Sequence, residues 1–206
     1  ILKLMLFATD VLLLAPVVVS GILLASRIVD AITDPLAGYL SDRTRSRWGR
    51  RRPWLLAAAP LVAIVVLMMW APPRGLDGLL LVAWMTAGIV GFYAAVTFVN
   101  VPHLSWGAEL SPDYHERNRI FGARLLLQNV GVFAAVGLLA FTEALGDQRA
   151  VMFWVAIAAG VTVVATTIWT SLRLPERDEF RALGPDRPWQ AIRDVLGNRH
   201  ARLLLA

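Results

Sequence analysis

Three charged side chains stand inside a segment between Pro16 and Ser41 that is otherwise largely apolar. They are Arg27, Asp30 and Asp34, and spacings of three and four place them on one face of a helix. Carboxylate oxygens are hard ligands that suit Na+ or a proton. One arginine can neutralise only one of the two aspartates, so the other carboxylate is a candidate cation or proton site. The alternative is an internal ion pair, Arg27 with Asp30 or Asp34, that only holds helices together.

Other polar side chains in or beside apolar segments complete the set of candidates. Thr33 adds a hydroxyl oxygen beside Asp34. Thr97 and Asn100 are three residues apart and share a helical face, although small polar residues of this kind also form interhelical hydrogen bonds. Arg124 is followed directly by three leucines. It either lines a cavity or extends its guanidinium to the membrane surface.

The elements that must carry these side chains are long apolar segments. Of the 206 residues, 57% are hydrophobic and 17% are charged, whereas a soluble domain carries about a quarter charged residues. This composition suits lipid and disfavours a soluble enzyme, a disordered tail or a disulfide scaffold. Five stretches are long enough to span a bilayer, at about 16–41, 53–71, 79–101, 120–144 and 150–172. The sequence therefore predicts an all-α, polytopic transmembrane helical bundle.

The two ends of the sequence suggest further helices. The apolar run at residues 1–8 is too short to cross about 30 Å of hydrocarbon, so we expect it to be the end of a truncated first helix. Residues 203–206 look like the start of another apolar segment. We expect part of a longer membrane protein, with a bundle over 1–172, a cytoplasmic connection over 173–199 and the start of a seventh helix at 200–206.

Arginine is distributed unevenly between the connections. Those at 42–52, 109–119 and 173–202 hold 15 arginines, while those at 72–78 and 145–149 hold 2. Because arginine stays on the cytoplasmic side during insertion, the first three connections are predicted to be cytoplasmic. The same distribution explains the net charge of +5. No nucleic-acid partner is expected, since no basic groove interleaved with aromatic residues is present.

Neither disulfides nor a zinc site is expected from the sequence. The chain has no cysteine, which excludes disulfides and metal sites with thiolate ligands. His103 and His115 have no third ligand at a matching spacing, so the sequence does not predict a zinc site.

The segment from Arg27 to Trp54 resembles a known family. It combines an Asp-x-x-x-Asp-Pro helix, from Asp30 to Pro35, with a Ser-Arg-Trp-Gly loop that leads through arginines to Pro53. This run is similar to the glycoside–pentoside–hexuronide:cation symporters of the major facilitator superfamily. The resemblance continues at Thr9-Asp10, at Asn100-Val101-Pro102, from Asp113 to Arg117, at Arg124 and over 193–205.

The resemblance implies a fold and an activity. The superfamily has two six-helix halves, each a pair of three-helix inverted repeats, and this chain would be the amino-terminal half with its first helix truncated. The implied activity is symport of a sugar or glycoside with Na+ or H+ by alternating access. It implies no cofactor beyond the coupling cation, a monomer, a lipid bilayer as surroundings and a bacterial inner membrane as location.

The resemblance also assigns residues. The implied cation site consists of Asp30, Thr33, Asp34 and Thr97. The implied substrate contacts are Arg124, Asn100 and Asp34. Asn100 stands where a well-studied member of the family has a sugar-binding acid and Leu104 where it has a stacking tryptophan, and both departures put a galactoside substrate in doubt. A conformational network is implied at Gly38, Asp42, Arg43, Arg50 and Arg51.

Two other functions are consistent with the sequence. A transporter of the same architecture could carry an amphipathic lipid or another non-sugar solute, which the apolar Leu104 favours. A membrane-embedded enzyme could use Asp30 and Asp34, but an aspartyl protease needs its two acids on different helices. We therefore expect a transporter and no enzyme.

Overall fold

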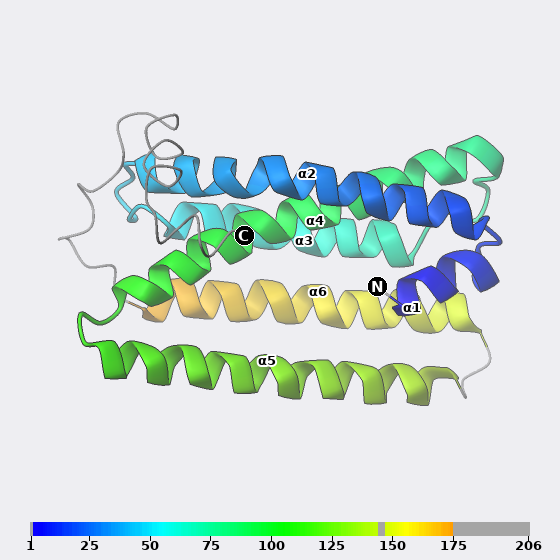
Figure 1. Ribbon diagram of the computed structural model, residues 1–206. Coiled ribbons are helices and arrows are strands. Elements are labelled where there is room, and N and C mark those ends of the chain that lie inside the picture. Colours follow the sequence, from blue (N-terminus) through cyan, green and yellow to red (C-terminus); the bar gives the residue numbers. More distant parts are fainter. Residues whose placement is uncertain (1, 144–146, 175–206) are drawn as a thin grey trace, which may run out of the picture.

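The computed structural model describes residues 2–143 and 147–174, which form helices joined by short connections (Figure 1). The long helices are α2 (Pro16–Arg43), α3 (Arg52–Trp70), α4 (Gly78–Glu109), α5 (Tyr114–Glu143) and α6 (Gln148–Arg173). A short α1 (Leu2–Leu6) precedes them and continues as a π-helical turn, η1 (Phe7–Val11). Each of the five long helices is long and apolar enough to cross a membrane. The predicted all-α transmembrane bundle is confirmed.

Two helices are longer than the apolar segments suggested. Helix α4 continues through Pro102 to Glu109 and α5 begins at Tyr114, so the connection expected over 109–119 is reduced to residues 110–113. Helix α2 likewise continues through a proline, Pro35. Transmembrane helices tolerate proline because neighbouring helices and local adjustments satisfy the freed backbone groups.

The helix starts follow the local sequence. Proline occupies the first turn of α2, at Pro16, and of α3, at Pro53, where a missing N–H costs no hydrogen bond. Helix α6 is capped by Asp147, whose carboxylate accepts hydrogen bonds from the backbone N–H groups of Arg149 and Ala150 at 3.0 and 3.3 Å. Such caps satisfy backbone donors that the first helical turn leaves unpaired.

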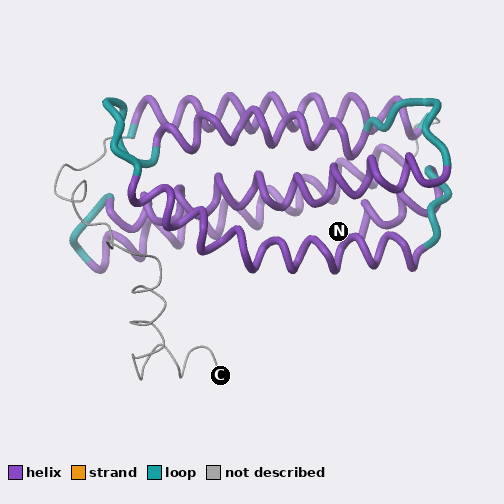
Figure 2. The backbone as a smooth tube through the Cα atoms, turned by 90° about the horizontal axis from the view of Figure 1, so that it is seen from above, coloured by secondary structure: helices purple, strands orange, loops and turns teal. Residues whose placement is uncertain are grey.

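Helix α3 is packed between two other helices. It contacts α6 on one side and α4 on the other, and α4 packs in turn against α2; Figure 2 shows the helices running lengthwise beside one another. Small residues allow the backbones to approach. A Cβ added to Gly160 would lie 3.1 Å from the Cβ of Ala63, and one on Gly91 would lie 3.2 Å from Cγ1 of Val65. These close approaches fix the rotation of α4 and α6 against α3.

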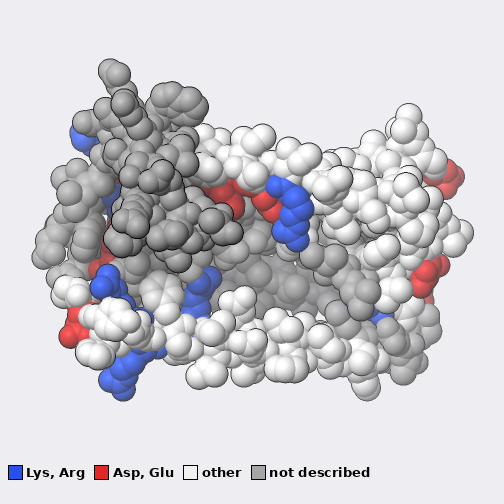
Figure 3. Space-filling view, viewed as in Figure 1, with Lys and Arg blue, Asp and Glu red and all other residues white. Residues whose placement is uncertain are grey.

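One end of the bundle collects the arginine-rich segments. It is formed by the α2–α3 connection (44–51), the α4–α5 connection (110–113) with the start of α5, and the end of α6, and we call it the arginine-rich end. Arg52 Nη2 donates a hydrogen bond to the backbone carbonyl of Leu174 at 2.5 Å, so the start of α3 and the end of α6 lie on the same side. Figure 3 shows basic side chains gathered toward this end of the visible face. Except for Arg173 and Leu174, the predicted segments 173–199 and 200–206 lie outside the described residues.

Helix α5 differs from the other long helices in its exposure. None of its described side chains is buried, and it makes few contacts with α4 and α6. Large apolar side chains such as Leu126, Phe133 and Phe141 are exposed on it. A helix that is apolar on all sides requires lipid or further protein around it.

Candidate functional site

A hydrogen bond between α2 and α4 joins two of the predicted cation ligands. Thr97 Oγ1 donates to Asp34 Oδ1 at 2.9 Å. Thr97 is buried, whereas Asp34 is exposed. The hydroxyl of Thr97 keeps oxygen lone pairs while it donates its proton. The pair therefore presents carboxylate and hydroxyl oxygens at one accessible point between the two helices.

The second aspartate has different partners. Arg27 Nη1 lies 3.5 Å from Asp30 Oδ2, and the Arg27 guanidinium carbon lies 4.8 Å from the centre of the Tyr93 ring. The other carboxylate oxygen of Asp30, Oδ1, is inaccessible and has no hydrogen-bond partner among the described residues. The hydroxyl of Thr33 donates to the backbone carbonyl of Asp30 at 3.4 Å. Arg27 is thus placed between a carboxylate of α2 and an aromatic ring of α4.

These contacts give the two aspartates different electrostatic surroundings. Arg27 compensates the charge of Asp30, while Asp34 meets only a neutral hydroxyl in the contacts described above. Together Arg27, Asp30 and Asp34 carry a formal charge of −1, which one monovalent cation or one proton neutralises. Among the described residues, no cluster of three or more His, Cys, Asp or Glu side chains is placed to hold a metal ion. The oxygen donors suit a small hard monovalent cation better than a resident transition metal.

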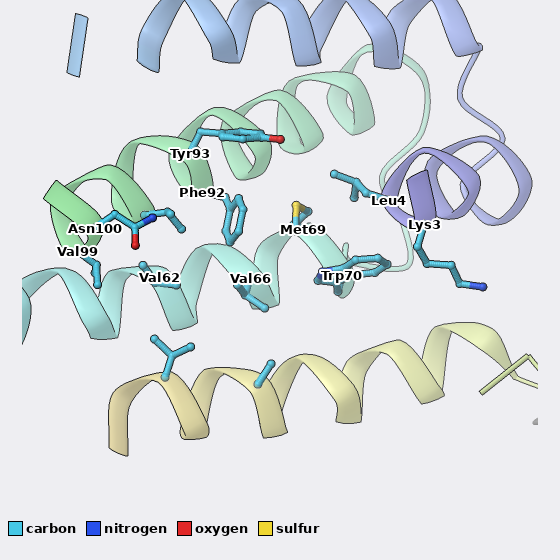
Figure 4. A pocket seen from close by; sticks show the side chains of 13 residues that line it. Lys3, Leu4, Val62, Val66, Met69, Trp70, Phe92, Tyr93, Val99 and Asn100 are labelled. Atoms are coloured by element: carbon cyan, nitrogen blue, oxygen red, sulfur yellow. The ribbon is translucent and has the colours of Figure 1, made fainter. Parts of the chain in front are cut away.

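Asn100 lines an apolar pocket between α3, α4, α6 and α1. This Asn100 pocket has a volume of about 550 Å³. Figure 4 shows Asn100 and Phe92 on α4, with Met69 of α3 beside Phe92. Tyr93 lines the same pocket, and its ring also contacts Arg27. Tyr93 therefore connects the candidate cation site with the Asn100 pocket.

Arg124 lines a different pocket, between α4 and α5. This Arg124 pocket has a volume of about 450 Å³, and its wall includes His103, Leu104, Phe121 and Leu127. Arg124 itself is half-buried, and most of the side chains that share this wall with it are apolar. Asn100 is not among the residues that line the Arg124 pocket, and Arg124 is not among those that line the Asn100 pocket. The described helices do not bring these two candidate substrate residues into one pocket.

The predicted conformational network contains a further carboxylate. Arg50 Nη2 and Arg51 Nη2 each lie 2.7 Å from Glu109 Oε1, and 3.7 and 3.1 Å from Asp42 Oδ1. Both arginines are buried. Burial lowers the pKa of Arg51, and Glu109 opposes this effect, so the guanidinium stays charged near neutral pH. This Arg–carboxylate cluster ties the α2–α3 connection to the last residue of α4.

The other two predicted network residues lie outside this cluster. Arg43 hydrogen-bonds the hydroxyl of Tyr39, one turn back on α2, and its guanidinium carbon lies 5.3 Å from that ring. A Cβ added to Gly38 would meet Cγ1 of Val101 at 3.7 Å, which is ordinary van der Waals contact. The described contacts alone therefore do not require glycine at this position.

Sequence reasoning missed two residues of the site, Glu109 and Tyr93. Tyr93 stands one helical turn before Thr97 and so shares its face, a signal that was available. Glu109 was assigned to a loop because the apolar segment ends near residue 101. The helix continues past the apolar segment, which brings Glu109 to the arginines.

Comparison with known proteins identifies relatives of the chain. Residues 2–206 match the MFS/sugar transport protein family. An uncharacterized symporter of Synechocystis is 31% identical over 192 residues, covering 88% of this chain and 35% of that protein. The isoprimeverose transporter of Lactiplantibacillus pentosus is 27% identical and covers 92% of this chain and 43% of that protein. The sodium-dependent lysophosphatidylcholine symporter 1 of Xenopus tropicalis is 31% identical and covers 62% of this chain and 24% of that protein.

The chain spans less than half the length of these relatives. The family match covers nearly the whole chain and agrees with the helical transmembrane fold. A transport family also sets aside the membrane-enzyme alternative. The chain therefore belongs to the MFS/sugar transport protein family, as the resemblance of its 27–54 segment predicted.

Proposed function

We propose that the protein of which this chain forms part is a cation-coupled symporter that moves its substrate by alternating access. The observation that carries the proposal is the arrangement around Arg27. That side chain neutralises Asp30, leaves Asp34 with Thr97 and contacts Tyr93, which lines the Asn100 pocket. The candidate cation site and a pocket large enough for a small solute are therefore connected through Tyr93.

The coupling step follows from charge. With Asp34 ionised, the α2–α4 contact carries an uncompensated negative charge, which is costly in a low-dielectric interior. Binding of one Na+ or one proton removes that charge. The neutral site lets α2 and its neighbours move through the membrane core with substrate bound, as alternating access around a midplane site requires.

We propose a sugar or glycoside as substrate. Arg124 and Asn100 offer hydrogen-bond donors, and aromatic and apolar walls around them suit the faces of a sugar ring. One relative is named an isoprimeverose transporter. The alternative substrate is an amphipathic lipid, because both pockets are mainly apolar in lining and another relative is named a lysophosphatidylcholine symporter.

Uptake by the full-length protein tests the substrate class. Proteoliposomes with an inward Na+ or proton gradient would be offered radiolabelled isoprimeverose and lysophosphatidylcholine in parallel. We expect gradient-dependent uptake of the sugar. Gradient-dependent uptake of lysophosphatidylcholine alone would replace the sugar proposal with the lipid one.

Arg124→Ala should weaken substrate binding while leaving cation binding intact. The guanidinium lies among apolar side chains, so a hydrogen bond from it to substrate is charge-assisted and shielded from water. Loss of such a bond costs about 2–5 kcal/mol. Isothermal titration of the full-length protein with substrate, and separately with the cation, measures both effects. Unchanged substrate affinity would assign Arg124 a structural role.

Tyr93→Leu should raise the apparent affinity for Na+ about fivefold, which corresponds to about 1 kcal/mol of cation–π energy. The ring holds Arg27 beside Asp30, so its removal frees a second carboxylate for the cation. Tyr93→Phe keeps the ring and should behave like the parent. The measurement is the Na+ concentration that gives half-maximal uptake, and equal values for Tyr93→Leu and Tyr93→Phe would contradict the role of the ring.

We propose that the arginine-rich end faces the cytoplasm, in a bacterial inner membrane. On a cysteine-free background, Arg47→Cys should react with a membrane-impermeant maleimide only after the cells are opened. Arg74→Cys, on the opposite side, should react in intact cells. Both arginines are exposed, so access depends on the side of the membrane. The reverse labelling pattern would invert the proposed orientation.

A further inference from the structure

The α2–α3 connection forms a polar pocket at the arginine-rich end, apart from the proposed transport site. This 44–50 pocket has a volume of about 380 Å³ and is lined by Thr44, Arg45, Ser46, Gly49 and Arg50. Its lining side chains are hydroxyls and guanidinium groups, and none of them is acidic. All of them can donate hydrogen bonds, which is the chemistry that an anion requires.

The wall of the pocket is fixed by a tight turn. The backbone N–H of Gly49 donates to the carbonyl of Ser46 at 3.1 Å, and that of Trp48 donates to the hydroxyl of Ser46 at 3.2 Å. Gly49 has a φ of 110°, a conformation that favours glycine. Trp54 Nε1 of α3 donates to the hydroxyl of Thr44 at 2.7 Å. These hydrogen bonds build the pocket into the connection.

One basic side chain at the pocket has no anionic partner among the described residues. The connection from Asp42 to Arg52 holds six arginines, of which Arg50 and Arg51 bond the carboxylates of Asp42 and Glu109. Arg45 is exposed, and the described residues provide it with no hydrogen bond or ion pair. Its guanidinium and the hydroxyl proton of Ser46 can meet a tetrahedral oxyanion from two sides.

We propose that the 44–50 pocket binds the phosphate group of an anionic membrane phospholipid. The pocket lies where membrane-spanning helices end, and Trp48 beside it is 54% exposed, with the Arg47 guanidinium 5.7 Å from its ring. Exposed tryptophan is typical of the membrane–water interface. Basic pockets at the ends of transmembrane helices bind phospholipid head groups. The pocket therefore lies at the depth where lipid phosphates lie.

The same pocket touches the Arg–carboxylate cluster. Arg50 lines the pocket and bonds Glu109, so a phosphate there adds a third anionic group near a buried guanidinium. The proposal needs only that the helices span a membrane, and it does not depend on the identity of the transported solute.

Binding of a short-chain lipid to the full-length protein tests the proposal. Delipidated protein in detergent would be dialysed against radiolabelled dihexanoyl-phosphatidylglycerol below its critical micelle concentration. We expect saturable binding of dihexanoyl-phosphatidylglycerol, and weaker binding of dihexanoyl-phosphatidylcholine at the same concentrations. The double variant Arg45→Gln/Ser46→Ala should weaken it at least about tenfold, as expected for loss of charge-assisted hydrogen bonds. Arg74→Gln removes one charge at the opposite end and should bind like the parent.

Three results would overturn the proposal. Equal affinities of the double variant and the parent would show that the pocket does not bind the lipid. Equal losses in Arg74→Gln and in the double variant would show non-specific attraction to positive charge. Displacement of the lipid by inorganic phosphate at similar concentrations would identify a free phosphate site instead. Thermal unfolding of each variant checks that it is folded. If the double variant is unstable, the single variant Arg45→Gln, which changes only an exposed side chain, replaces it in the binding measurement.

Discussion

Asp34→Asn should abolish cation-driven accumulation of substrate while the protein remains folded and inserted. An imposed gradient of about tenfold supports about tenfold accumulation with one coupled cation, since a factor of ten corresponds to about 1.4 kcal/mol. The variant should reach only equal concentrations inside and outside. The reason is that Asp34 holds the negative charge that the cation neutralises, and an amide at that position leaves Thr97 with a neutral partner. Uptake into proteoliposomes under Na+ or proton gradients measures the effect.

Asp30→Asn is the matched comparison for Asp34→Asn, because it removes the same formal charge from the same helix face. Asp30 is already compensated by Arg27, so this variant should retain part of the accumulation and lose Na+ stimulation more than proton coupling. A proton needs fewer oxygen ligands than Na+. Asp77→Asn, an exposed acid on the opposite side of the bundle, should transport like the parent. Full accumulation in both Asp34→Asn and Asp30→Asn would refute the cation site and leave a purely structural ion pair.

Glu109→Gln should produce the largest loss of stability among single variants of the arginine-rich end. Glu109 bonds two buried arginines at once, at 2.7 Å each, and the variant would replace this shared carboxylate with a neutral amide. Removing one partner from a buried charge cluster costs about 3–5 kcal/mol. The thermal midpoint of the detergent-solubilised full-length protein should fall clearly, and the turnover rate should fall with it if the cluster holds one conformer.

A double-mutant cycle separates this pairing from a general effect of charge. Glu109→Gln and Arg51→Gln together should destabilise less than the sum of the single variants, because the Glu109–Arg51 ion pair that each single variant breaks can be lost only once. Asp77→Asn, which removes an exposed carboxylate outside the Arg–carboxylate cluster, is the control for a general effect of charge on stability. Additive effects of Glu109→Gln and Arg51→Gln would show that the 2.7 Å contact contributes little to stability.

The sequence determined which segments span the membrane and which residues share a face. Bilayer thickness sets the length of an apolar run, so all five long helices could be read directly, and the spacing of Arg27, Asp30 and Asp34 required one face of α2. The arginine counts separated the two sides of the bundle. These features depend on local sequence and on the solvent, and neither requires knowledge of how one helix packs against another.

Only the tertiary structure decided which groups meet. Arg27 pairs with Asp30 instead of Asp34. The hydrogen bond from Thr97 to Asp34 and the contact of Arg27 with Tyr93 depend on how far α4 is rotated and shifted along α2. The separation of Asn100 and Arg124 into two pockets depends on how α4 packs against α3 and α5. The rotation of α4 and α6 against α3 is set by close packing at small residues such as Gly91 and Gly160. No spacing within one helix encodes that packing, so partners on other helices, including Glu109, could not be assigned from the sequence.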